Sequence, residues 1–316
     1  MTIFYTLIML YCNRMRGISY PSVRYKRIEW INLDHARKHD IDAIAQVFGL
    51  NEQHAQSLCT RDHRSHVYEG NGYTLVCLVH PIFDQAADDI QARELDVILT
   101  PTRLVTVHHG HLLPVSARFQ NVSANPSALE QPVRMFGELL HDLLVDASHT
   151  IDHISTSIDA FEGALLRRPG RGSIQQILQI QTNVIDAKKL LENQRYMVDR
   201  LLLGQPERVR RSVAMRFDEI RSHQAELSHI LETELQAAQT LHHVLDASIN
   251  ERTNALIRAL TILSLIMLPA TLLAGIFGMN AAYPWILGAP FDFSIIIGIM
   301  LLIGALILFL IRSKKL

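Results

Sequence analysis

The sequence predicts an α+β membrane protein with an N-terminal cytosolic α/β domain, a long helical stalk and two C-terminal transmembrane helices. Three observations support this fold class. Short alternating or β-branched segments separated by turn residues fill residues 21–125. Helical periodicity then continues over residues 126–254. Two apolar runs follow, at 255–277 and 294–311, and a bilayer is crossed by a helix of roughly 20 apolar residues.

Composition excludes several classes of function. The chain has 316 residues and a net charge of −1, which suits a soluble part joined to a small membrane part. No basic patch with interleaved aromatic residues is present, so nucleic acid is not an expected partner. Cys12, Cys59 and Cys77 lack metal-like spacing and indicate a reducing compartment. No glycine-rich phosphate loop, nucleophile elbow or acid/base pair supports an enzyme.

Residues 1–20 are set apart as an N-terminal extension. The apolar segment Thr2–Cys12 is too short to span a membrane and lacks the basic lead-in of a secretory signal. Two interpretations remain: a translation-start artefact with Met15 as the true start, or a strand on the soluble domain.

The cytosolic α/β domain is assigned to residues 21–125. One helix is predicted from Ala36 to Phe48, ended by Gly49. The expected strands are Tyr25–Ile31, Tyr73–Val79, Leu95–Leu99 and Leu104–His108, and the expected turns are at Asn71-Gly72, Pro81, Pro101 and Gly110.

Helical arms and a stalk are assigned to residues 126–254. Two long helices, Ser127–Leu166 and Ile174–Leu203, are separated by a Pro- and Gly-containing break and are expected to pair antiparallel. After Pro206 the chain shows heptad-like apolar positions at Val213, Phe217, Ile220, Leu227, Leu231, Leu235, Ala238, Leu241, Leu245 and Ile249. No breaker separates them from the first apolar run, so one helix of roughly 100 Å is predicted from Glu207 to Phe277.

The first membrane helix, 255–277, carries an unusual polar stripe. One helical face, extended back into the stalk, gathers Asn254, Ile257, Thr261, Ser264, Leu268 and Thr271, then Gly275 and Gly278. Small and hydroxyl-bearing residues inside a membrane face a partner helix or a water-filled cavity. Several copies side by side therefore share either a dry, tightly packed seam or a pore, and the stripe alone does not choose between them.

The segment 278–293 contains Gly278-Met279-Asn280 and an outer loop. Asn280 is interpreted either as a helix C-cap or as one carboxamide in a ring that holds the waters of a hydrated cation, as Mg²⁺ requires. Pro269 removes a backbone donor, and the freed Leu265 carbonyl is expected to pair with a Ser or Thr hydroxyl or with water.

The charge distribution predicts the topology. The loop 281–292 has no Lys or Arg, whereas Arg252 and Arg258 precede the first span, and Arg312, Lys314 and Lys315 lie in the basic tail 312–316. By the positive-inside rule both termini are cytoplasmic and the loop is outside. We expect a multi-pass protein of the cytoplasmic (inner) membrane.

These motifs resemble the CorA family of divalent-cation channels. The resemblance rests on Gly278-Met279-Asn280 at the end of the first of two C-terminal membrane helices, and on Pro269 followed by Thr271. Further matches are Asn254, Arg258, Leu260 and Thr261 of the family's Asn-x₃-Lys/Arg-x-Leu-Thr pattern, with weaker strand matches at Ile28–Leu33 and Arg103–Val107.

The resemblance implies a homopentamer that takes up Mg²⁺, and also Co²⁺ or Ni²⁺, with Mg²⁺ as both transported and regulatory ion and no other cofactor. Gly278, Met279 and Asn280 would form the selectivity filter, and the stripe would line the pore. Cytosolic Mg²⁺ bound between subunits would hold the pore shut. On this analogy Asp218 and Glu219 of the stalk would pair with Asp88 or Asp89 of a neighbour.

Two features keep alternatives open. The outer loop has Asp292 as its only acid, whereas many family members carry an acidic loop, and Phe277 replaces the usual Tyr. Sixteen histidines, including His108, His109, His111, His149, His153, His229 and His243, would suit a ZntB-like Zn²⁺ transporter of the same architecture. A non-conducting, membrane-tethered coiled-coil protein is the alternative from another functional class.

Overall fold

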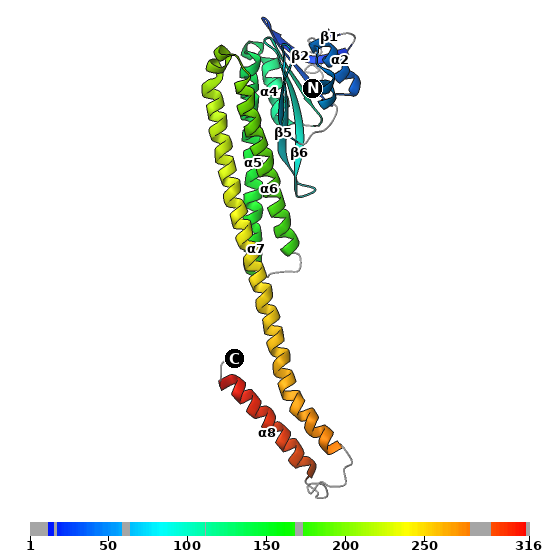
Figure 1. Ribbon diagram of the computed structural model, residues 1–316, viewed down its shortest axis with the longest axis vertical. Coiled ribbons are helices and arrows are strands. Elements are labelled where there is room, and N and C mark those ends of the chain that lie inside the picture. The colour runs from blue at the N-terminus through cyan, green and yellow to red at the C-terminus, as the bar shows by residue number, and fades with distance from the viewer. Residues whose placement is uncertain are drawn as a thin grey trace. The chain divides into compact units, whose positions relative to one another are not determined.

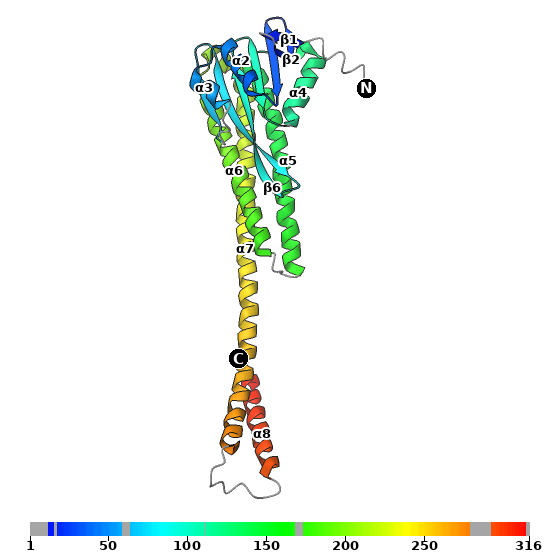
Figure 2. The same ribbon diagram turned by 90° about the vertical axis from the view of Figure 1, so that its right-hand side faces the viewer.

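The fold was analysed in a computed structural model. The structure describes residues 12–15, 18–58, 64–110, 112–167, 173–278 and 292–313. The chain divides into two compact units, Met1–His242 and His243–Leu316, and each is described by itself. Figures 1 and 2 show the elements of both.

A seven-stranded sheet forms the centre of the first unit. Its strand order is β1-β2-β3-β7-β6-β5-β4, and all neighbours pair antiparallel except β3 and β7, which are parallel. The strands are β1 (Cys12–Met15), β2 (Ile18–Tyr25), β3 (Ile28–Asp34), β4 (His66–Glu69), β5 (Thr74–Asp84), β6 (Asp89–Leu99) and β7 (Arg103–His108). The sheet therefore begins upstream of residue 21, the start assigned from sequence.

The first predicted strand, Tyr25–Ile31, is wrong in its bounds. The chain turns at Lys26, which has a left-handed φ of 54°, so the segment is a hairpin that joins β2 to β3. Lys26-Arg27 lacks the Asn or Gly that usually marks such a turn, and for that reason the sequence pattern did not show it.

Pro81 was predicted as a turn, but it lies inside β5 opposite Ala92 of β6. A proline is tolerated where one edge of a strand has no ladder to complete. β4 pairs only with Thr74–Cys77, so at Pro81 the other edge of β5 faces no strand among the described residues. The predicted turns at Gly72 and Gly110 are confirmed by their positive φ angles of 83° and 103°.

Helices α2 (Lys38–Phe48) and α3 (Glu52–Ser57) cover one face of the sheet. α2 ends at Gly49 in the left-handed conformation, as the sequence predicts, whereas α3 was not predicted. Its N-cap is Asn51, whose side chain accepts a hydrogen bond from the His54 amide at 2.7 Å. The core on this face comprises Ile31, Leu33, Ile41, Ile44, Leu75, Cys77, Ile98, Val105 and Val107, with others around them.

The opposite face packs against α4 (Leu113–Ala124), α5 (Pro132–Arg167) and α6 (Ser173–Leu203), and Figure 1 shows α2 across the sheet from α5 and α6. A short 3-10 turn, η2 (Pro126–Ala128), links α4 to α5. Trp30 of β3 is fully buried, meets Phe119 of α4 edge-on at 5.2 Å, and donates to the Thr106 hydroxyl at 3.0 Å. The sequence analysis did not predict α4, because its alternation of apolar and polar residues at helical spacing is short and weak.

Helix α7 (Glu207–Gly278) is a single helix, which confirms the predicted stalk. Its part in the first unit packs against α5 and α6 through predicted heptad positions, of which Val213, Phe217, Ile220, Leu227, Leu231 and Ala238 are buried. Gly137 of α5 allows close approach: a Cβ there would lie 3.2 Å from the Phe217 ring. The structure thus has the N-terminal α/β domain and the long helix that the sequence predicts, with the corrections to individual elements given above.

The second unit contains the end of α7 and α8 (Asp292–Ser313). Within the described residues, α7 holds the one stretch long and apolar enough to cross a membrane, and none of that stretch is buried. The apolar part of α8 covers Ile297–Ile307. Gly304 of α8 lies near Ile266 of α7, whose methyl would be 3.8 Å from an added Cβ.

Candidate ion pathway and regulatory carboxylates

The predicted pore-lining stripe lies on the exposed C-terminal part of α7. Asn254, Ile257, Thr261, Ser264, Leu268 and Thr271 are all exposed in the single chain. A stripe of hydroxyl, amide and aliphatic groups has oxygen atoms that can bind water, and its aliphatic side chains could narrow a pathway shared by several copies. One chain supplies only one side of such a pathway.

The stripe hydroxyls are partly satisfied within the helix. Thr261 donates to the Ile257 carbonyl and Thr271 donates to the Met267 carbonyl, each at 2.8 Å. The Leu265 carbonyl freed by Pro269 was expected to pair with a Ser or Thr hydroxyl or with water, and the Thr271 hydroxyl donates to the Met267 carbonyl instead. Each hydroxyl keeps its lone pairs, so it can still accept a hydrogen bond from water.

Only part of the predicted filter can be placed. Gly278 is the last residue of α7. Met279 and Asn280 lie outside the described residues. Their role as a filter stays a prediction.

The predicted regulatory acids Asp218 and Glu219 lie on α7 and point into solvent, with side chains 69% and 53% exposed. Each pairs with an arginine of its own helix. Glu219 accepts from Arg216 Nη1 at 2.9 Å, and Asp218 accepts from Arg221 Nη1 at 3.2 Å. A depression on this surface is lined by Met215, Asp218, Glu219, Ser222, His223 and Glu226. Exposed carboxylates of this kind suit a cation that keeps most of its water shell.

Asp88 and Asp89 lie at the β5–β6 hairpin, which is fixed to α6. Asp89 Oδ1 accepts from Gln179 Nε2 at 3.2 Å, and the Asp88 carbonyl accepts from Asn183 Nδ2 at 3.0 Å. Asp88 is exposed and has a left-handed φ of 53°. The acids of this hairpin are thus held in place on the surface of the unit.

The two acidic pairs do not meet within one chain. Asp89 contacts Gln179 of α6, whereas Arg221, the partner of Asp218, contacts Asp199 of the same helix. Positions 179 and 199 are about 30 Å apart along a helix that rises about 1.5 Å per residue. In the part of the chain that the structure describes, no three His, Cys, Asp or Glu side chains are grouped to hold a metal. A cation bridging these acids therefore requires a second copy.

The histidines singled out in the sequence occupy separate environments. His153 stacks on Phe83 at 5.1 Å, and buried His108 contacts the Gly110 carbonyl at 2.9 Å. His229 and His243 lie exposed on α7, and His111 is outside the described residues. Among the described residues, the histidines that cluster in the sequence are therefore not grouped to bind a common metal ion.

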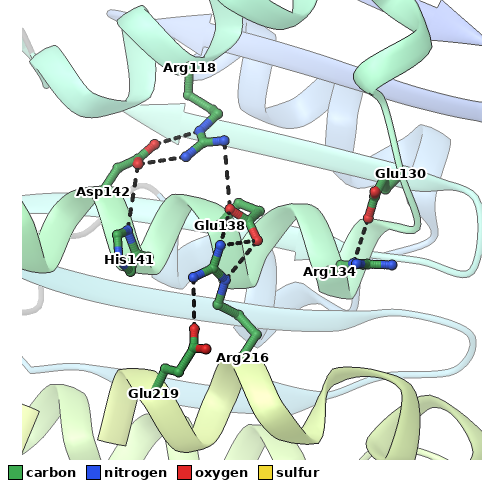
Figure 3. Close-up of polar contacts among 8 residues, drawn as sticks. All are labelled: Arg118, Glu130, Arg134, Glu138, His141, Asp142, Arg216 and Glu219. Atoms are coloured by element: carbon green, nitrogen blue, oxygen red, sulfur yellow. Dashed lines mark hydrogen bonds and ion pairs between the residues drawn. The ribbon is translucent and has the colours of Figure 1, made fainter. Parts of the chain in front are cut away.

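An ion-pair network that the sequence analysis missed joins α4, α5 and α7 (Figure 3). Arg118 of α4 binds Asp142 of α5 with two hydrogen bonds of 2.5 and 2.6 Å. Arg216 of α7 binds Glu138 of α5 with two of 2.7 Å. Arg118 and Glu138 are 3.8 Å apart. Hydrogen bonding to Glu138 raises the pKa of Arg216, so this guanidinium stays charged.

Three buried polar groups were also missed. Burial raises the pKa of Asp96, which faces Cys77 across β5 and β6, to about 7. His80 is buried, and its Nε2 lies 2.9 Å from Asp146 of α5. Gln224 of α7 is 1% exposed, and neither amide atom has a partner among the described residues. Gln224 lies at a heptad position between Ile220 and Leu227. A polar residue at such an apolar position was the sequence signal that could have predicted this buried amide.

Comparisons with known proteins agree on one family. The family described as CorA-like Mg²⁺ transporter protein matches residues 25–314. The cobalt/magnesium transport protein CorA of Thermotoga maritima is 21% identical over 290 residues, which is 90% of this chain and 82% of that protein.

Two solved structures share the fold. The CorA magnesium transporter from Methanocaldococcus jannaschii aligns with a TM-score of 0.77 at 15% identity, over 93% of this chain and 94% of that chain. The ZntB cytoplasmic domain from Vibrio parahaemolyticus gives a TM-score of 0.60 at 11% identity, over 72% of this chain and 90% of that one.

Proposed function

The chain belongs to the CorA family of metal-ion transporters, and from this premise we propose that it forms a homopentameric channel for Mg²⁺ uptake across the cytoplasmic membrane. Family members are transporters and not enzymes. The related protein of Thermotoga maritima is named for cobalt and magnesium transport. Co²⁺ is therefore a further ion expected to pass, and Ni²⁺ is expected from the resemblance to the family.

One observation carries the proposal: a single helix, α7, packs into the first unit and also bears the apolar, stripe-carrying segment. A helix shared by both parts can pass a change in the first unit to the apolar segment. A single tether helix surrounded by lipid would need no stripe of polar groups within its apolar segment, because lipid offers those groups no partner, so the stripe favours the assembly of several copies.

In the proposed assembly both apolar helices, 255–277 and 294–311, cross the bilayer, with both termini in the cytoplasm. Five copies of the stripe enclose the pathway. Five Asn280 carboxamides encircle its outer mouth and hold the waters of the entering cation. Ile257 and Leu268 narrow the pathway to apolar rings that close it when they lose water.

Regulation is proposed at the carboxylates. A cytosolic divalent cation bridges Asp218 or Glu219 of one copy and Asp88 or Asp89 of the next. Support comes from the exposure of the α7 pair and from the hydrogen bonds that fix the hairpin to α6. Because the cation binds one arrangement of the copies better than the other, it biases the pore toward closure.

Ion flux into vesicles that contain the purified protein tests the proposal. We expect uptake of Mg²⁺, inhibited by Co²⁺ and Ni²⁺ in the same vesicles. Uptake of Zn²⁺ with no competition from Mg²⁺ would instead indicate a zinc transporter. The absence of any flux would indicate a non-conducting tether.

The filter is tested by Asn280→Ala. We expect selective uptake to be lost while the assembly, measured by size-exclusion chromatography with light scattering, stays intact. Asn121→Ala, on the exposed surface of α4, is the matched control and should transport normally. Normal uptake by the Asn280 variant would remove this residue from the filter.

A further inference from the structure

Two arginines of α7 share an unusual arrangement. Each binds a carboxylate on α7 and, with other nitrogen atoms of the same guanidinium, a carboxylate on a neighbouring helix. Arg216 joins Glu219 of α7, at 2.9 Å, to Glu138 of α5, at 2.7 Å (Figure 3). Arg221 joins Asp218 of α7, at 3.2 Å, to Asp199 of α6, at 2.8 Å. The α7 carboxylates are those proposed to bind the regulatory cation.

The two ends of the Arg216 bridge differ in burial. Glu219 is 53% exposed, whereas Glu138 is 24% exposed and also lies near Arg118. An exposed carboxylate that loses its arginine is hydrated at little cost, but a carboxylate withdrawn from water is destabilised when its partner leaves. Arg216 therefore stays on Glu138 if another cation takes Glu219. For Arg221 the two ends differ less in burial, since Asp199 is 47% and Asp218 is 69% exposed, and the longer contact is the one to Asp218 on α7.

We propose that Arg216 and Arg221 are resident counter-ions that a divalent cation displaces from Glu219 and Asp218. After displacement each guanidinium binds only the carboxylate on the neighbouring helix: Arg216 binds Glu138 of α5, and Arg221 binds Asp199 of α6. Cation binding thereby tightens α7 against α5 and α6, and cation release loosens it. The inference rests on the proposed regulatory role of Asp218 and Glu219. It adds the positioning residues through which that site acts on the stalk.

The arrangement makes two separable predictions. Removing the arginines should strengthen cation binding, because a competing positive charge is lost. It should also weaken the inhibition of uptake, because the connection to α5 and α6 is lost. A residue with only a structural role would weaken both. Since each displaced contact is a partly exposed ion pair, we expect an affinity gain of about two- to fivefold.

The test uses Mn²⁺ as the probe, with free Mn²⁺ measured by electron paramagnetic resonance on the full-length protein in detergent. Asp218→Asn with Glu219→Gln identifies the binding sites that belong to these carboxylates. Arg216→Gln with Arg221→Gln should bind Mn²⁺ at those sites two- to fivefold more tightly than the wild type. In vesicles it should need a higher internal Mg²⁺ concentration for half-inhibition of uptake.

A charge-matched control is Arg210→Gln with Arg211→Gln, because both arginines pair with Glu207 of the same helix. This control should leave Mn²⁺ affinity and inhibition unchanged. Arg216→Lys keeps the positive charge without the two-point contact to Glu138. It should keep the wild-type affinity but lose part of the inhibition, and it serves if the double glutamine variant does not fold.

Unchanged or weaker Mn²⁺ binding in the double glutamine variant would overturn the displacement proposal while leaving the regulatory site in place. If the Asp218 and Glu219 variant loses no Mn²⁺ site, the regulatory assignment fails and the displacement proposal fails with it. If that variant also transports and is inhibited normally, the channel function stands and only its regulation must be placed elsewhere.

Discussion

The two parts of helix α7 differ in what covers their apolar side chains. In the first unit, heptad residues such as Phe217 and Leu231 are buried against other helices of the same chain. In the second, Leu268 is 69% exposed, and none of the apolar stretch is buried. The first part is covered by helices of its own chain, whereas the exposed apolar side chains of the second part would be covered by lipid and by other copies in the proposed assembly. One helix thus combines a segment stabilised by its own chain with one stabilised by its surroundings.

The largest expected effect comes from the buried part. Phe217→Ala should destabilise the first unit by about 3–5 kcal/mol, since it removes a buried ring and leaves a cavity. Thermal unfolding of the full-length protein in detergent, followed by circular dichroism, measures the loss. Met215→Ala, at a side chain 79% exposed two residues earlier, should change the stability by less than about 0.5 kcal/mol. Equal effects would contradict the difference in burial.

Asp96 should make the stability of the first unit depend on pH. Its pKa is raised by burial to about 7, against about 3.9 in an unfolded chain. Below about pH 4 both states hold the proton, so no stability is lost. As pH rises toward 7, only the unfolded state releases it, and the loss reaches on the order of 4 kcal/mol.

Unfolding measured from pH 4 to pH 8 checks this dependence, with Asp96→Asn as the comparison. The asparagine variant should lose less stability than the wild type over that interval. Parallel curves for the two proteins would show that Asp96 does not hold its proton in the folded state.

A smaller change of opposite sign is expected at Gln224. Gln224→Leu should stabilise the first unit by about 1–3 kcal/mol, because a buried amide without hydrogen bonds is replaced by an apolar side chain of similar size. The same unfolding measurement detects the gain. Destabilisation would indicate that the amide has partners in the assembled protein, and the two parts of α7 would then differ less than the single chain implies.

The smallest effect is expected in the exposed part. Leu268→Ala should leave the unfolding of the first unit unchanged but raise the Mg²⁺ leak at inhibiting internal Mg²⁺, because the apolar ring becomes wider and easier to wet. Flux into vesicles measures it, with Leu263→Ala, which lies on another face of the helix and is 53% exposed, as the control. Equal leak in both variants would remove Leu268 from the closing ring.

Periodicity predicted the long elements well. The heptad pattern around Phe217 and Leu231, the cap at Gly49 and the uninterrupted α7 are all local signals, and the structure has all three. The bounds of short elements were predicted wrongly, because they depend on pairing with neighbouring strands. The hairpin at Lys26 and the strand through Pro81 are stabilised by neighbouring strands rather than by their own sequences.

The candidate site was predictable only in part. The i,i+3 spacing of Arg216 with Glu219, and of Asp218 with Arg221, is visible in the sequence. Their contacts with Glu138 and Asp199 join residues far apart in the chain, and no periodicity relates them. The filter remains a prediction from the resemblance, because Asn280 lies outside the described residues.

Water access to the stripe tests the central claim most directly. In a protein whose native cysteines are replaced by serine, Ser264→Cys and Thr271→Cys place thiols on the stripe, whereas Ile266→Cys places one beside Gly304 of α8. A charged, membrane-impermeant thiol reagent should modify the two stripe positions in the open channel, and Mg²⁺ should slow that reaction. Ile266→Cys should stay unmodified. Unreactive thiols at all three positions, in protein that is assembled and membrane-inserted, would mean a dry helix bundle with no path for ions.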